Sequence, residues 1–268
     1  MESTYEIDNP SLSYQTKVDY WATGFGLQKV DNLEPSPYML ELAKEQIEGK
    51  IEYQQIYEQI TKYHDEIDDS TKEADIVALR IVELLSSHAF KFAPSTLKMI
   101  HEELFQGILN PDYPIGEYRH NNITKKEAIL EGDTVIYDDY RTIEASLNYD
   151  FDQEKKFNYQ RKSSEEIVQH LKEFMSGIWQ IHPFREGNTR TVTVFMIKYL
   201  RYMGFEVDNT PFQQHARYFR DSLVLDNAKK LKQHPEYLKK FFDNLLLEGR
   251  NELSLVKMYQ EVLPKQEK

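Results

Sequence analysis

The sequence predicts a mainly α-helical fold, and three observations carry that prediction. Apolar residues recur at helical spacing along most of the 268 residues. Helix start and stop signals flank several of these stretches. One segment departs from the pattern, because residues 132–140 place turn residues on both sides of a short β-prone run. We therefore expect a helical body that carries one small β-hairpin or loop.

Local signals justify each helix in turn. Ser36 and Pro37 are typical of an N-cap and a first helical turn, and Gly49 is typical of a stop. Ser163 and Glu166 have the spacing of a capping box ahead of a strongly periodic stretch. Residues 1–75 are expected to form an N-terminal helical region and residues 76–268 the main domain. In chain order, the expected helices cover residues 36–49, 53–60, 76–85, 94–104, 163–179, 188–203 and 235–247.

Composition excludes several classes of function. The net charge is −12, so nucleic acid and anionic membranes are not expected as partners, because the long-range field would repel them. The chain has no Cys, which rules out disulfides, thiolate metal sites and a cysteine nucleophile. No apolar run approaches the ~20 residues that span a bilayer. The start, MESTYEID, lacks a basic region followed by an apolar stretch, so no signal peptide and a cytoplasmic location are expected.

The stretch HPFREGNTR, residues 182–190, concentrates groups suited to phosphate chemistry. It lies between two expected helices and leads into the N-terminus of the second, where free backbone N–H groups and Gly187 can bind an anion. Arg190 in the first turn opposes the helix dipole, which favours a role in reaching a ligand. Glu186 can bind Mg²⁺ together with substrate phosphates, and His182 can accept a proton near neutral pH. Together these groups suggest phosphoryl or nucleotidyl transfer.

Simpler interpretations of the same residues stay open at this point. A single His at a helix end is more often structural, and a Glu between two Arg is usually part of a surface ion pair. His182 and Glu186 lack a third transition-metal ligand at a telling spacing. The Walker A pattern and the kinase Gly-rich loop are both absent. Spacing alone leaves phosphate chemistry and a structural role as alternatives.

The stretch resembles the signature of the Fic family, HPFx(D/E)GNxRxxR. GEYR at residues 116–119 resembles the family's G-x-Y-R segment, and the expected hairpin at 132–140 lies where the family carries its target-docking flap. The resemblance extends from about residue 75 onward and implies a Fic-type helical bundle. The positions that match in order are Ile181, His182, Pro183, Phe184, Glu186, Gly187, Asn188 and Arg190.

The resemblance implies transfer of AMP from ATP to a Ser, Thr or Tyr hydroxyl of a target protein. It implies that His182 is the general base, that Glu186 holds Mg²⁺, and that Phe184 anchors the loop. The implied binding site for ATP and its phosphates comprises Gly187, Asn188, Thr189 and Arg190. The implied target-docking flap comprises Thr134, Val135, Ile136 and Tyr137, whose backbone would pair with an extended segment of the target.

Two features bear on regulation. The last Arg of the signature would fall at residue 193, where this chain has Thr193, so the second cation is missing. Many Fic proteins also carry an inhibitory helix with the pattern (S/T)xxxE(G/N), and KEQIEG at 44–49 and NLLLEG at 244–249 come close. We favour Glu48, within the helix at 36–49, because a carboxylate in a last turn opposes the dipole; Glu248 is the alternative.

Three classes of function are therefore carried forward. The first is a protein adenylyltransferase that is autoinhibited and that also modifies itself or an unknown target. The second uses the same site to remove AMP, or to move another phosphate-containing group. The third is a repressed protein of the toxin–antitoxin type whose surface binds a partner. The sequence identifies neither the target nor the oligomeric state.

Overall fold

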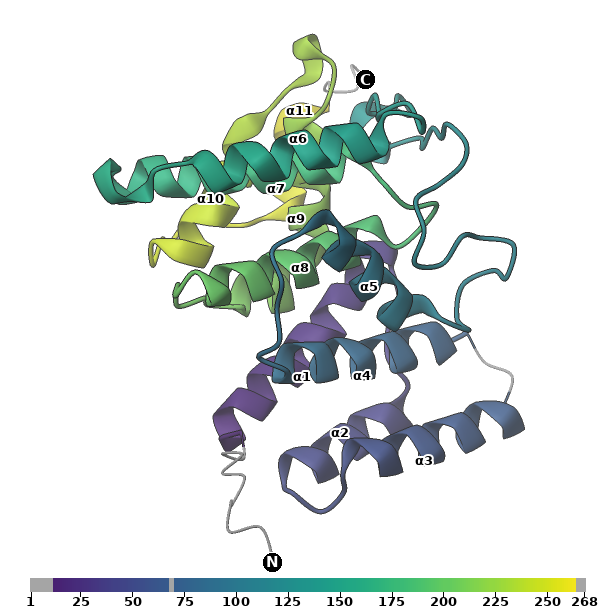
Figure 1. The fold of residues 1–268 in the computed structure, drawn as a ribbon. Helices are drawn as coiled ribbons and strands as arrows, with labels where there is room; N and C mark the ends of the chain where they lie inside the picture. Colours follow the sequence, from purple (N-terminus) through teal and green to yellow (C-terminus); the bar gives the residue numbers. More distant parts are fainter. Residues whose placement is uncertain (1–11, 68–69, 264–268) are drawn as a thin grey trace, which may run out of the picture.

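The computed structural model describes residues 12–67 and 70–263, and these residues form an all-helical fold without β-strands (Figure 1). Four short 3₁₀ helices accompany the α-helices, at Lys29–Asp31, Ala128–Leu130, Tyr159–Arg161 and Lys230–Lys232. The α-helices are α1 (Tyr14–Gln28), α2 (Pro37–Ile47), α3 (Tyr53–Glu66), α4 (Lys72–Ser86), α5 (Pro94–Phe105), α6 (Ile143–Lys156), α7 (Ser164–Ile181), α8 (Asn188–Tyr202), α9 (Thr210–Asp226), α10 (Pro235–Leu246) and α11 (Leu255–Val262).

The prediction of a mainly helical fold is confirmed, and the local signals act as expected. The Ser36 hydroxyl accepts a hydrogen bond from the Met39 backbone N–H at the start of α2. Ser163 and Glu166 form the reciprocal capping box at the start of α7. Four helices were not predicted, namely α1, α6, α9 and α11.

The predicted β-hairpin at residues 132–140 is wrong. One pair of main-chain bonds closes the turn before the segment: the Glu127 N–H donates to the Asp133 carbonyl at 2.9 Å, and the Gly132 N–H donates to the Glu127 carbonyl at 2.9 Å. No second pair follows along residues 134–140 in the described chain. Val135 and Tyr137 are buried and Ile136 is 65% exposed, so the side chains alternate as in a strand. A hairpin needs a second strand with reciprocal main-chain bonds, and the preceding residues instead turn into a 3₁₀ helix. We call residues 132–140 the flap segment.

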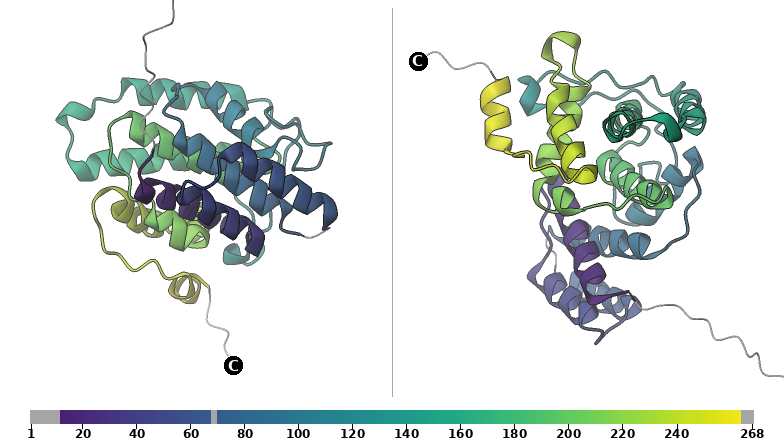
Figure 2. Two further views of the ribbon diagram at one scale, coloured as in Figure 1. Left: turned by 90° about the horizontal axis from the view of Figure 1, so that it is seen from below. Right: turned by 90° about the vertical axis from the view of Figure 1, so that its left-hand side faces the viewer.

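A single hydrophobic core runs through the molecule and takes side chains from all eleven described α-helices. Helix α1 packs between α4 and α9, and α8 packs against α4, α5 and α7. Figure 2 shows α2 and α3 as a pair at one end of the molecule, away from α6, α7 and α10. The loop that joins α7 to α8 connects two helices of this core, and its His182 and Phe184 side chains are buried.

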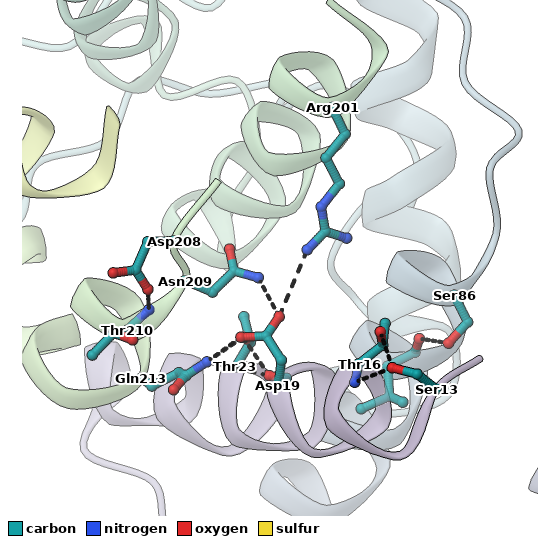
Figure 3. A network of polar contacts seen from close by, with 11 residues as sticks. Ser13, Thr16, Asp19, Thr23, Ser86, Arg201, Asp208, Asn209, Thr210 and Gln213 are labelled. Atoms are coloured by element: carbon teal, nitrogen blue, oxygen red, sulfur yellow. Dashed lines mark hydrogen bonds and ion pairs between the residues drawn. The ribbon is translucent and has the colours of Figure 1, made fainter. Parts of the chain in front are cut away.

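Asp19 of α1 ties the N-terminal region to α8 and α9 (Figure 3). Its carboxylate accepts hydrogen bonds from the side-chain amides of Asn209, at 2.8 Å, and Gln213, at 2.7 Å. Arg201 at the end of α8 adds an ion pair at 3.8 Å. Helix α1 is thus part of the same core as the main domain, and the domain boundary at residue 75 stays a prediction.

Membrane insertion was not expected, and no helix within residues 12–67 and 70–263 is long and apolar enough to cross a bilayer. The segment on which the signal-peptide expectation depends, MESTYEID, lies outside the described residues.

Candidate active site

The loop between α7 and α8 has a backbone path that requires two left-handed residues. His182 ends α7 with φ 52°, and Gly187 precedes α8 with φ 73°. A Cβ on Gly187 would lie 2.4 Å from the Phe105 ring, so both conformation and space require glycine. The Phe184 side chain is fully buried and stacks on His101, with ring centroids 4.0 Å apart. Phe184 therefore lies where the sequence resemblance implied, in the core.

Asn188 holds the loop closed. Its side-chain oxygen accepts from the Phe184 N–H at 2.9 Å, and its amide nitrogen donates to the Phe184 carbonyl at 2.9 Å. The neighbouring Thr189 hydroxyl accepts from the Trp179 indole N–H at 3.0 Å. The side chain of Asn188 is thus committed to loop structure, and any contribution to anion binding comes from its backbone at the N-terminus of α8.

Arg119, the last residue of GEYR, clamps the same loop from outside. Its backbone N–H donates to the Pro183 carbonyl at 2.8 Å, and its side-chain Nε donates to the His182 carbonyl at 2.8 Å. The guanidinium also donates to the carbonyls of Asn121 and Asp138. The side chain is only 2% exposed, so this arginine fixes the catalytic loop, its own loop and the flap segment in one frame.

His101 of α5 supplies a further brace that the sequence did not reveal. Burial lowers its pKa to about 4, so the ring is neutral at neutral pH. Nδ1 accepts from the Gly116 N–H at 3.0 Å, which leaves Nε2 to donate to the Glu186 carbonyl at 3.1 Å. The backbone of Glu186 is therefore held while its carboxylate stays available.

His182 has the protonation state that a general base needs. Burial lowers its pKa to about 3, so the imidazole is neutral at neutral pH. Nδ1 lies 3.2 Å from the Trp179 carbonyl, which can only accept, so Nδ1 carries the proton and Nε2 keeps a lone pair. The ring of Tyr137 stacks on the imidazole with centroids 4.0 Å apart. Tyr137 thus contacts the His182 ring directly, which the resemblance had not indicated.

A narrow cleft brings His182 together with Glu186 and the start of α8. It has free space for only about one water molecule, and a cavity of about 260 Å³ adjoins it. Glu127 Oε1 and the Tyr137 hydroxyl are buried there without a hydrogen-bond partner among the described residues, which is typical of a site that takes a polar ligand. The cleft is lined by Asp31, Lys125, Glu127, Tyr137, Trp179, His182, Glu186, Asn188, Thr189 and Arg220.

Arg190 does not line this cleft itself, but it is bound by two carboxylates, and one of them, Asp31, does line it. Its Nη2 lies 2.6 Å from Glu73 Oε1, and its Nε lies 3.0 Å from Asp31 Oδ2. The second contact has the distance of an ion pair without the angle of a hydrogen bond. Gln28 adds a bond to Nη1 at 3.1 Å, and the side chain is 1% exposed. Arg190 therefore carries the predicted positive charge, but Asp31 and Glu73 already neutralise it.

Thr193 does not supply the positive charge that the last Arg of the signature would have carried. The residue is fully buried in α8, and its hydroxyl donates to the Thr189 carbonyl at 2.7 Å. Lys125 and Arg220 reach the cleft instead, although Arg220 is paired with Glu127 and Asp221. No spacing pattern pointed to these two cations, because Lys125 comes from a separate loop and Arg220 from α9.

The structure does not bring the two candidate inhibitory residues to the cleft. Glu48 is the C-cap of α2, and its carboxylate pairs with Lys50 Nζ at 2.5 Å. The bond from Lys50 lowers the pKa of Glu48. Glu248 is exposed, just beyond α10, with φ 51°. The carboxylates that contact Arg190 are Asp31 and Glu73, which no sequence pattern pointed to.

One face of the flap segment covers the cleft, and the other face is exposed to solvent. Val135 and Tyr137 point inward, whereas Ile136 is exposed and its carbonyl accepts from the side-chain amide of Gln180. The hydroxyl of Thr134 donates to the Val135 carbonyl at 2.9 Å and accepts from the Lys125 N–H.

Comparison with known proteins agrees with this geometry. Residues 91–200, which include the GEYR segment, the flap segment and the HPFREGNTR loop, match the model of the Fic/DOC family. This part of the chain is therefore similar to a Fic domain. A curated relative from Sinorhizobium fredii (strain NBRC 101917 / NGR234), the probable protein adenylyltransferase y4lH, is 36% identical over 63 residues. That match covers 24% of this chain and 32% of the relative, so the chain spans about a third of that protein's length.

The chain is also similar to solved structures. One is the N-terminal Fic domain of a putative cell filamentation protein of Bartonella quintana with bound ADP, at a TM-score of 0.50 and 20% identity. The match covers 72% of this chain and 85% of that one. The N-terminal Fic domain of Bep8 from Bartonella sp. 1-1C has a TM-score of 0.49 and 18% identity, over 73% of this chain and 87% of that one.

Proposed function

We propose that this chain transfers AMP from ATP to a Ser, Thr or Tyr hydroxyl of a protein. The observation that carries the proposal is the placement of His182. A neutral imidazole, with its Nδ1 proton held by the Trp179 carbonyl, shares one cleft with Glu186 and the N-terminus of α8. The base and the anion-binding backbone are therefore adjacent, as an attack by a hydroxyl on a phosphate requires. The name of the Sinorhizobium relative supports this assignment.

The reaction has one proton transfer and one substitution at phosphorus. Nε2 of His182 takes the proton of the target hydroxyl, and the oxygen forms a bond to the α-phosphorus. The bond from that phosphorus to the oxygen bridging to the β-phosphate breaks, and pyrophosphate leaves. Backbone N–H groups at the start of α8 stabilise the negative charge of the phosphates, because they point at the ligand and the helix dipole adds to them.

The residues present fit a magnesium ion. Glu186 faces the cleft, forms no ion pair within the described residues, and has its backbone held by His101. No cluster of three or more His, Asp or Glu side chains suited to a metal occurs among the described residues. A lone carboxylate fits Mg²⁺, which binds through one or two carboxylates, phosphates and water. Mg²⁺ held by Glu186 would neutralise phosphate charge.

The resting enzyme is autoinhibited in this proposal, and Arg190 is the point of control. Asp31 and Glu73 occupy the guanidinium that would otherwise neutralise the departing pyrophosphate. Asp31 also lines the cleft, where its charge opposes the entry of phosphates. The narrow cleft has to widen before ATP binds. Asp31 and Glu73 thus take the part that the sequence pattern assigned to Glu48.

Labelled ATP separates this function from its alternatives. The protein is incubated with α-labelled ATP, Mg²⁺ and cell lysate, and His182→Ala serves as the matched control. We expect labelled protein with the wild type, and a loss of ~10²–10⁴-fold in the variant, because general-base catalysis is worth about that much. Release of AMP from a pre-modified protein, without labelling, would support the reverse reaction. If neither labelling nor AMP release is detected, the result would support a partner-binding protein.

A further inference from the structure

A further cavity adjoins the loop between α7 and α8 and shares no lining residue with the narrow cleft. It measures about 380 Å³ and is formed by the loop 112–122 and by Arg185, the variable residue of the HPFREGNTR stretch. His182 and Glu186 do not line it. The cavity is therefore adjacent to the site of transfer without being part of the phosphate site. Its lining residues are Asp112, Tyr113, Pro114, Arg119, His120, Asn121, Asn122 and Arg185.

Arg185 gives this cavity a free positive charge. The side chain is exposed and forms no ion pair among the described residues, in contrast to Arg190. Its guanidinium lies over the Tyr113 ring, 5.5 Å from the centroid, so a cation–π contact holds it in place. The lining includes one carboxylate, Asp112, against two arginines. A cationic spot on a chain of net charge −12 is suited to an anionic side chain.

The walls of the cavity are fixed relative to the catalytic base. Arg119, which lines the cavity, donates to the carbonyls of His182 and Pro183. On the opposite wall, Asn122 bonds to the flap segment: its side-chain oxygen accepts from the Tyr140 N–H at 2.9 Å, and its amide donates to Asp139. A target segment that lies along the flap segment therefore meets His182 and the cavity at fixed positions relative to each other.

We propose that this cavity is a subsite for an acidic side chain of the target, with Arg185 as the residue that recognises its carboxylate. An Asp or Glu a few residues from the modified hydroxyl binds the Arg185 guanidinium, and the side-chain amide of Asn121 supplies a further donor. The subsite deepens the proposed function, on which its role in catalysis rests. Arg185 acts in target choice and touches neither ATP nor the base.

The test measures binding and transfer separately. Fluorescent peptides each contain one Tyr acceptor and one Glu, placed at each of roughly four positions on either side, and a matched Gln series is the control. Binding to the full-length protein is followed by fluorescence anisotropy. We expect the Glu series to bind about fivefold more tightly than the Gln series at one preferred position, as for a partly exposed arginine–carboxylate pair. Arg185→Glu should reverse this preference, and Arg185→Lys should keep part of it.

Arg250→Glu is the matched control for net charge, because Arg250 is exposed and remote in sequence from the loop. It should leave the preference unchanged. Equal affinity for the Glu and Gln peptides at every position would overturn the subsite, and so would equal losses from Arg185→Glu and Arg250→Glu. AMP transfer to the same peptides is then measured with labelled ATP. A preference for Glu in binding without any transfer would refute the proposed function and keep the subsite. Transfer without a preference for Glu would keep the proposed function and refute the subsite.

Discussion

Removing the carboxylate of Asp31 should activate the enzyme. The Asp31→Asn substitution keeps the shape of the side chain and removes the charge that lies 3.0 Å from Arg190 Nε. The Arg190 side chain is 1% exposed and that of Asp31 is 24% exposed, so the pair is only partly screened. A fully buried pair would lose ~3–5 kcal/mol on removal of one partner, and an exposed one ~0–1 kcal/mol. For this pair we take an intermediate loss of about 1.4 kcal/mol. Such a loss shifts the equilibrium between the narrow cleft and a cleft wide enough for ATP about tenfold.

The assay is the initial rate of labelling at ATP concentrations below saturation. Asp31→Asn should raise this rate about tenfold, Glu73→Gln should raise it to a similar degree, and the double variant should exceed both. Glu48→Gly is the comparison variant, because its carboxylate contacts Lys50 and should not affect the rate. An unchanged or lower rate in Asp31→Asn, with an unchanged melting temperature, would refute the reasoning. A several-fold rise in Glu48→Gly alone would return the brake to α2, and a rise in Glu248→Gly alone would move it to the C-terminal part of the chain.

Three further results are expected. Glu186→Ala should abolish labelling, and EDTA should do the same to the wild type, because the carboxylate would share Mg²⁺ with the phosphates; full activity in EDTA would exclude a metal-assisted step. Val135→Pro should lower target labelling more than ATP binding if the flap segment docks a target strand, and an equal loss of both would count against docking. The free energy of unfolding should fall as the pH drops below ~6.5, by up to about 1.4 kcal/mol per pH unit, because the unfolded chain protonates His182 while the folded chain keeps its pKa at about 3. Urea titrations should show a shallower fall in His182→Ala.

The centre of the active site could be predicted from sequence because its interactions are local. The left-handed Gly187, the Asn188 bonds to Phe184 and the start of α8 all lie within nine consecutive residues. Residue types and spacing determine such a loop almost completely. The helices with clear caps, such as α2 and α7, were predictable for the same reason.

The rest of the site depends on contacts between residues far apart in the chain. Glu73 and Gln28 are separated from Arg190 by 117 and 162 residues, and Arg119 from His182 by 63. No spacing pattern encodes such pairs. Helix α1 escaped prediction for a related reason, because it packs between α4 and α9 and is buried on two sides, so no single apolar stripe marks it. The flap segment alternates like a strand but has no partner strand to pair with.

The bonds of Asp19 to Asn209 and Gln213 have a consequence for biosynthesis. These partners follow Asp19 by 190 and 194 residues, yet they hold the first described helix in the core. At translation rates of about 5–20 residues per second, α1 leaves the ribosome roughly 10–40 s before α9 exists. During that time the face of α1 that packs against α9, where Gly26 meets Gln213, has no permanent cover. The fold is therefore completed only late in synthesis, when α9 covers this face of α1.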